Sequence, residues 1–302
     1  MIRRAIVPLI ALCAALGVGI ALGGGPLSDR GDASTAASAS AGRAQAVSDA
    51  QVKEGQKLAA ATAPLLYAKK LTGQQVAIVA MPDAPSNVVT TLASQIGAAG
   101  GVVTSTTRVA KTAVDPASKS LIGTLGSQLA GQVHGLVDAT QPPYTRLGQL
   151  IGGAVGTTSA AAAPTTDQAT TLATLAESKL LTVDGAPSST SATKASVRST
   201  APLVLLVLGD HVDPTILAGI VQGTATRAHG VVVAGSTGSG LRGDLKRLRA
   251  ADLGTQAKTV ATVDGDEQAM GQMATVLALV HQIAGGGGAY GASGIDGVAP
   301  LG

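Results

Sequence analysis

Short aliphatic runs bounded by turns recur along the chain and constrain its fold more than any other feature. The clearest are QVAIVAM at Gln75–Met81, PLVLLVLG at Pro202–Gly209 and GVVVAG at Gly230–Gly235. Each run has the length of one strand, and its uninterrupted hydrophobicity is typical of strands covered on both faces, as in parallel sheets. The sequence therefore predicts an α/β fold with a mainly parallel sheet flanked by helices.

Segments with helical periodicity lie between the predicted strands. Asn87–Ala99 places Val88, Leu92 and Ile96 on one face, and a further strand follows at Gly101–Thr107. This order predicts a βαβ unit with a parallel pair and a right-handed crossover. Other predicted elements are helices at 117–137, 145–155, 166–178, 215–228, 241–251 and 267–284, a strand at 258–264 and a loop at 188–200.

Composition excludes several classes of protein. The chain is 45% hydrophobic but has no Phe, no Trp and three Tyr, so its core must be aliphatic. Aromatic cages, base-stacking surfaces and the aromatic belts of membrane barrels all need rings that this chain lacks. The net charge is +3 and the basic residues are scattered, so we expect no nucleic-acid partner.

The amino-terminal segment has the features of a membrane anchor. Arg3 and Arg4 precede an uncharged stretch, residues 5–25, which as a helix would be roughly 30 Å long and could cross a bilayer. The flanking charges favour a cytoplasmic amino terminus and an exported remainder. We therefore predict a single-pass transmembrane anchor in membrane lipid at 1–27, with a cleaved signal peptide as the alternative.

Small residues recur at a spacing of four within this segment. Ala15, Gly19 and Gly23 would lie on one face of a helix, and Gly19 and Gly23 form a GxxxG motif in an apolar setting. The spacing predicts that two anchors pair through this face, which would make the protein a homo-oligomer. The alternative is that Gly and Ala are simply abundant throughout the chain.

Composition also divides the exported part. Residues 28–42 are rich in Ser, Ala and Gly and predict a flexible linker, whereas 43–72 predict a helical stalk in which Pro64 restarts the helix. The stalk lacks the sustained heptads of a coiled coil. The α/β domain is expected at 73–284, and a mobile Gly-rich tail at 285–302.

One loop combines residues that could bind a metal ion. Asp210, His211 and Asp213 directly follow a predicted buried strand, and ligands of open α/β sheets bind at the carboxyl ends of strands. They are weak candidates for a metal site. The alternative, which we favour, is a polar loop in which Asp213 caps the helix that starts at Pro214.

Two further groupings have an ordinary structural interpretation. GSTGSG at Gly235–Gly240 lies between a strand and a helix, where backbone amides can hold a phosphate, but it lacks the lysine of a Walker loop and is more simply a flexible turn. Arg242, Lys246 and Arg249 fall on one predicted helical face that could meet anionic headgroups or an acidic partner. A solvated basic face is the simpler interpretation.

Three segments carry a resemblance to a known family. GVGIALGGGPL, LTGQQVAIVAMPDA and TVDGDEQAMGQMATVLALVHQIAGGGGAYG occur in that order, and together they resemble the mycobacterial copper transport protein B (MctB-like) family of actinobacterial envelope proteins. The resemblance implies a role in copper efflux or tolerance and a pore-forming oligomer of the outer membrane. It also implies a possible protein partner, because related proteins look like partners of an envelope assembly factor at the septum.

The residues themselves give less support to a pore or to direct copper binding. After Gly25 the apolar runs are short core strands, so a pore would have to come from oligomerised anchors. Copper favours sulfur and imidazole ligands, yet Met270 and Met273 have the spacing of a helix face packed in a core. No spacing identifies a catalytic set, so we expect no enzyme activity, and a copper ion is suggested as a ligand only by the family resemblance. Two hypotheses remain, a copper-efflux protein and a non-catalytic envelope scaffold.

Overall fold

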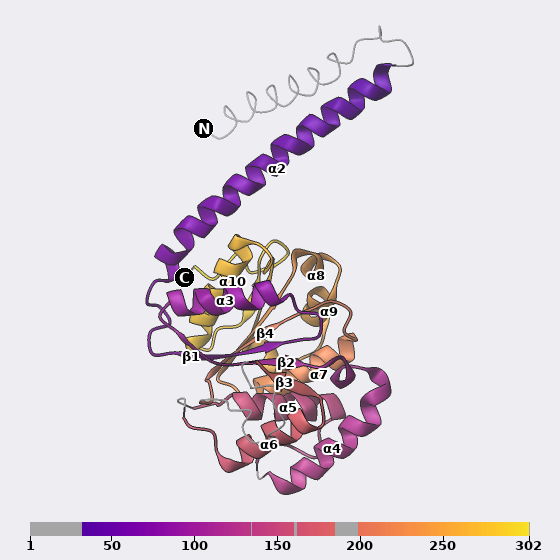
Figure 1. Ribbon diagram of the computed structural model, residues 1–302, viewed down its shortest axis with the longest axis vertical. Helices are drawn as coiled ribbons and strands as arrows, with labels where there is room; N and C mark the ends of the chain where they lie inside the picture. The colour runs from indigo at the N-terminus through magenta and orange to yellow at the C-terminus, as the bar shows by residue number, and fades with distance from the viewer. Residues whose placement is uncertain (1–31, 134, 160–161, 185–198, 302) are drawn as a thin grey trace, which may run out of the picture. The chain divides into compact units, whose positions relative to one another are not determined.

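The computed structural model describes residues 32–133, 135–159, 162–184 and 199–301 (Figure 1). The chain divides into two compact units, Met1–Gly55 and Gln56–Gly302. The boundary falls within one long helix, α2 (Asp32–Tyr67). All described strands belong to the second unit.

The predicted anchor lies outside the described residues. Segment 1–27, with the pairing face of Ala15, Gly19 and Gly23, is therefore still a prediction. Within the described ranges, no helix combines the length and the apolar character needed to cross a membrane.

Helix α2 corrects two predictions about the segment before the sheet. Residues 28–42 are predicted as a flexible linker, yet from Asp32 onward this segment is helical. Alanine, the best helix former, recurs through it and outweighs the serine and glycine content. Pro64 lies inside the helix and does not restart it. The helix ends at Tyr67, two residues before Lys69, whose left-handed backbone (φ of 61°) does not continue a helix.

The described strands form one sheet of seven, in the order β3-β2-β1-β4-β5-β6-β7 (Figure 1). Neighbouring strands are parallel except β2 and β3, so the predicted mainly parallel sheet and the first βαβ unit are confirmed. The strands are β1 (Gln75–Ala80), β2 (Val102–Val109), β3 (Leu181–Val183), β4 (Leu203–Val207), β5 (Gly230–Gly235), β6 (Val260–Asp264) and β7 (Gly288–Tyr290).

Helices cover both faces of the sheet, as expected for parallel strands buried on both sides. Along β1, Val76 and Ile78 face the apolar cluster formed with α3, α10 and the last turns of α2, whereas Ala77 and Val79 face the cluster formed with α4, α5, α6, α7 and α9. The helices are α3 (Ser86–Ala98), α4 (Lys119–Gln132), α5 (Pro143–Val155), α6 (Thr166–Glu177), α7 (Pro214–Ala225), α8 (Thr237–Leu241), α9 (Asp244–Ala250) and α10 (Ala269–Ile283), with 3-10 turns at Lys111–Ala113, Pro116–Ser118 and Gly254–Lys258.

Helices α5 and α7 approach so closely that their contact requires glycine. A Cβ atom on Gly223 of α7 would lie 2.0 Å from the carbonyl oxygen of Thr145, and one on Gly148 of α5 would lie 2.3 Å from that of Ile220. Gly152 and Gly219 continue the contact, so each helix presents two glycines four residues apart. Thr224 Oγ1 donates a hydrogen bond of 3.3 Å to Gly148 O across the contact.

The carboxyl-terminal segment corrects a second set of predictions. Residues 285–302 are predicted as a mobile tail, but Gly288–Tyr290 form β7 and pair in parallel with β6. Beyond β7, Asp296 closes the outer edge of the sheet. Its N–H donates to Ala289 O, and its carboxylate accepts a hydrogen bond of 2.8 Å from the Ala289 N–H.

The buried face of α10 differs from the prediction at one residue, Met270, whereas Met273 packs against the core as predicted. Met270 is exposed, whereas the small residues Gly271, Ala274 and Ala278 are buried. Gly271 packs on the backbone of Gly265, where a Cβ atom would lie 2.0 Å from the Gly265 carbonyl oxygen. This contact turns the small side chains, and not Met270, toward the sheet.

Candidate functional site

The candidate site lies at the carboxyl ends of β4, β5 and β6, and the weak metal and phosphate candidates of the sequence follow β4 and β5. The chain reverses its direction of winding at β1 and β4, which are neighbours in the sheet. In open α/β folds this is where a ligand-binding crevice forms. The groups that fill the loops after these strands therefore determine what this edge of the sheet can bind.

The loop after β4 contains the three predicted metal candidates. Asp213 caps α7, because its Oδ1 accepts hydrogen bonds from the N–H groups of Thr215 (2.8 Å) and Ile216 (3.2 Å). This confirms the capping interpretation. Asp210 and His211 are exposed, and His211 has a left-handed backbone with φ of 76°.

Backbone fills the crevice between the loops after β1 and β4. Gly209 packs against Pro82–Ala84 so closely that a Cβ atom would lie 1.9 Å from the Pro82 carbonyl oxygen. Three residues further along the loop, Val212 donates its N–H to the buried carboxylate of Asp244 at 2.8 Å. The two loops therefore meet directly at the place where a crevice would form.

The loop after β5 is ordered by the chain's own acceptors. Gly235–Gly240 is predicted as a flexible turn, but its last four residues, from Thr237 onward, belong to the short helix α8. Ser236 Oγ accepts from the Ser239 N–H at 3.0 Å, and both carboxylate oxygens of Glu267 lie 3.1 Å from the Thr237 N, which donates to them. The carboxylate of Glu267 thus accepts from the Thr237 N–H, which could otherwise donate to a bound phosphate.

The loop after β6 buries an aspartate that has no compensating donor for one of its oxygens. Asp266 is 1% exposed, and its Oδ2 has no hydrogen-bond partner among the described residues. Burial, followed by the negative charges of Glu267 and Asp210, raises the pKa of Asp266 to about 7. The carboxyl group is therefore half protonated near neutral pH.

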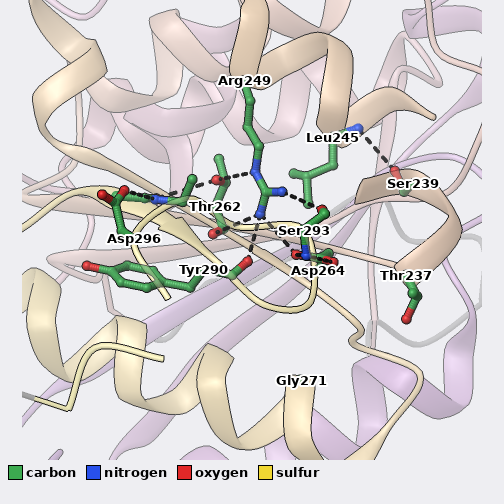
Figure 2. Close-up of polar contacts among 12 residues, drawn as sticks. Thr237, Ser239, Leu245, Arg249, Thr262, Asp264, Gly271, Tyr290, Ser293 and Asp296 are labelled. Carbon is green, nitrogen blue, oxygen red and sulfur yellow. Dashed lines mark hydrogen bonds and ion pairs between the residues drawn. The ribbon is translucent and has the colours of Figure 1, made fainter. Parts of the chain in front are cut away.

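Next to this loop, a buried arginine ties four segments together (Figure 2). Arg249 of α9 donates from Nε to Thr262 Oγ1 (2.9 Å), from Nη1 to Ser293 Oγ (2.8 Å), and from Nη2 to Tyr290 O (2.7 Å). Its Nη2 also lies 3.1 Å from the buried Asp264 carboxylate, which in turn accepts from the Ser293 N–H at 3.0 Å. These contacts join α9, β6, β7 and the loop that follows β7.

The prediction of a solvated basic face is wrong for this arginine. The Arg249 side chain is only 14% exposed, and Arg242 belongs to the end of α8 and not to the helix of Lys246 and Arg249. The prediction of one basic helical face failed because α8 and α9 are two helices, separated by a break at Gly243. A Cβ atom on Gly243 would lie 2.8 Å from Ser239 Cα. The partners of Arg249 also come from distant positions in the chain.

The sequence matches the family described as "Copper transport outer membrane protein, MctB" over residues 1–300. The chain belongs to the MctB family. This agrees with the resemblance seen in the sequence and supports a copper-related role in the cell envelope. No curated protein matches the chain.

The described residues provide few side chains that could bind the copper ion named in the description of the MctB family. No three side chains of His, Cys, Asp or Glu in the described ranges are placed to share a metal ion. Asp210 and Asp213 would supply hard carboxylate oxygens, whereas copper favours sulfur and imidazole. Of the methionines, Met81 is buried and Met273 packs against the core beneath α10, as predicted, whereas Met270 is exposed.

Two clefts border these loops in the described part of this member of the MctB family, and Asp213 contributes to the lining of the first. One, of about 410 Å³, is lined by Pro142, Pro143 and Tyr144 at the start of α5 and by Thr215 of α7. The other, of about 420 Å³, lies beside the Arg249 cluster, with Lys246 in its lining. Each cleft mixes apolar walls with a few charged groups.

Proposed function

We propose that the protein supports copper tolerance as an envelope scaffold, with its α/β domain outside the cytoplasm and without enzyme activity of its own. The copper-related part rests on the match to the MctB family over residues 1–300. The scaffold part rests on one observation: the chain's own groups occupy the positions at the carboxyl edge of the sheet where an α/β enzyme would hold a ligand.

Three contacts make up this observation. Gly209 packs against Pro82 at the crevice, Asp213 caps α7, and Glu267 accepts from the Thr237 N–H at the start of α8. All three contacts lie at the edge of the sheet where ligands of open α/β folds bind. The domain is therefore better suited to present its outer surface to another protein than to bind a small ligand at this edge.

The test separates a scaffold from a copper-conducting pore. In cells that lack the protein, the full chain should restore copper tolerance, and crosslinking in those cells should capture one recurrent envelope protein. Purified full-length protein in planar bilayers should give no copper-dependent conductance. Conductance by the full chain, or restored tolerance without any stable neighbour, would overturn the scaffold.

Matched variants test direct copper binding by the loop after β4. The full chain is titrated with Cu(I) and Cu(II) alongside Asp210→Asn, His211→Ala and Asp213→Asn, the last of which preserves the helix cap. The scaffold predicts the same titration for all four proteins. Loss of a stoichiometric copper site in the His211→Ala protein would instead assign metal binding to this loop.

A further inference from the structure

The turn between β6 and α10, Gly265–Gln268, is the meeting point of several elements. The N–H groups of Gly265 and Asp266 donate to Gly235 O at 2.8 and 3.2 Å, which ties the turn to the end of β5. Glu267 ties it to the start of α8 through the Thr237 N–H. The backbone of the turn is thus held to two neighbouring segments.

A series of glutamine contacts extends the turn toward two helices. Gln272 Nε2 of α10 donates to Asp266 O at 3.0 Å, and Gln272 Oε1 accepts from Gln95 Nε2 of α3, also at 3.0 Å. Gln268 Oε1 accepts from Gln56 Nε2 of α2, whose Oε1 accepts from the Met270 N–H. The same turn therefore holds α3 and the part of α2 that begins at Gln56.

Asp266 is the one carboxyl buried inside this turn. Its Oδ2 is unpartnered within the described residues, so an ionised side chain would lack a donor there. The charges that act on it are both negative, Glu267 in the same turn and Asp210 in the loop after β4. α3 has no ionisable side chain, α10 has only His281 near its far end, and Glu54 and Lys57 flank Gln56 on α2.

We propose that this turn is a proton-controlled clasp: neutral Asp266 lets it close on α2, α3 and α8, and ionisation of Asp266 opens it. A negative charge at this position is buried against two others, and its energy falls only if water reaches it. Water enters when the turn moves away from Gly235. That movement breaks the bond between Gln272 and Asp266 O and loosens the contacts of Gln95 and Gln56.

Hydrogen exchange on the full chain tests the clasp. We measure exchange in peptides that cover 265–272 and 56–67 between pH 5.5 and 8.5, and correct each rate for the intrinsic pH dependence of amide exchange. We expect protection in both peptides to fall at least tenfold with a midpoint near pH 7, where the pKa of Asp266 lies. Protection that stays constant over this range overturns the proposal.

Three variants identify the group that titrates. Asp266→Asn keeps the shape and cannot ionise, so its protection should not change with pH. Asp210→Asn removes a facing negative charge and should move the midpoint to lower pH; it decides the question even if Asp266→Asn fails to fold. Glu177→Gln, an exposed change at the end of α6, should behave as the parent protein. An unshifted midpoint in Asp210→Asn, or pH-dependent protection in Asp266→Asn, refutes the clasp.

Discussion

The contact between α5 and α7 predicts that Gly223→Ala is strongly destabilising. A Cβ atom there would lie 2.0 Å from Thr145 O and 2.6 Å from Gln149 N. Both atoms are backbone, so relief requires the helices to separate by about 1 Å or more, because ordinary contacts to Cβ begin near 3.4 Å.

The magnitude follows from three effects. Overpacking a core typically costs about 1–3 kcal/mol, occasionally more, and this clash is with backbone. Separation also weakens the hydrogen bond from Thr224 to Gly148 O, worth about 1 kcal/mol. Replacing glycine by alanine within a helix stabilises the helix by about 1 kcal/mol, which offsets part of this loss. We expect the free energy of unfolding to fall by about 1–3 kcal/mol.

Urea denaturation of the full chain, followed by far-ultraviolet circular dichroism, measures the change. Gly123→Ala in the interior of α4 is the matched control, because the nearest atoms to its Cβ would lie 3.8 Å away. The control should leave stability unchanged or raise it by up to about 1 kcal/mol. If Gly223→Ala unfolds at the same urea concentration as Gly123→Ala, the inference that α5 and α7 approach this closely is wrong.

Three further predictions concern charged side chains. Arg249→Met leaves the Asp264 carboxylate buried without its partner and should lower the free energy of unfolding by ~3–5 kcal/mol in the same urea assay; a loss under 1 kcal/mol would contradict a buried pair. Asp213→Ala removes the cap of α7 and should cost about 1 kcal/mol, whereas Asp213→Asn should cost much less, and equal losses would argue against capping. Because the pKa of Asp266 rises from 3.8 to about 7 on folding, the folded state binds more protons between these values, so stability is greatest below pH 4 for this group and falls as pH rises to 7, by ~1.4 kcal/mol per unit at most. Thermal unfolding of the parent and Asp266→Asn between pH 4 and 8 checks this, and the fall should be smaller in the variant.

The strand and helix order could be predicted because its signal is local. Aliphatic runs such as Gln75–Met81 and faces such as Val88, Leu92 and Ile96 show their periodicity within a few residues, and the structure places them as expected. β3 and β7 have three residues each, too few for a period, and only pairing with a neighbouring strand makes them strands.

The polar centres could not be predicted because their partners are distant in sequence. Arg249 contacts Thr262, Asp264, Tyr290 and Ser293, which lie on other elements up to 44 residues away. The burial of Asp266 likewise depends on how α10 packs on the end of the sheet. By contrast, capping by Asp213 could be predicted, since the cap and the helix it starts are adjacent in sequence.

The paired hydrogen bonds between Asp296 and Ala289 affect how readily copies of the protein associate through the edge of the sheet. An exposed strand edge can recruit further strands from other copies of the same chain. Here the last residues of the chain shield the edge at β7. A carboxyl-terminal fusion placed after Pro300 should leave the molecule dispersed, whereas truncation before Asp296 would turn the same edge into a template for aggregation.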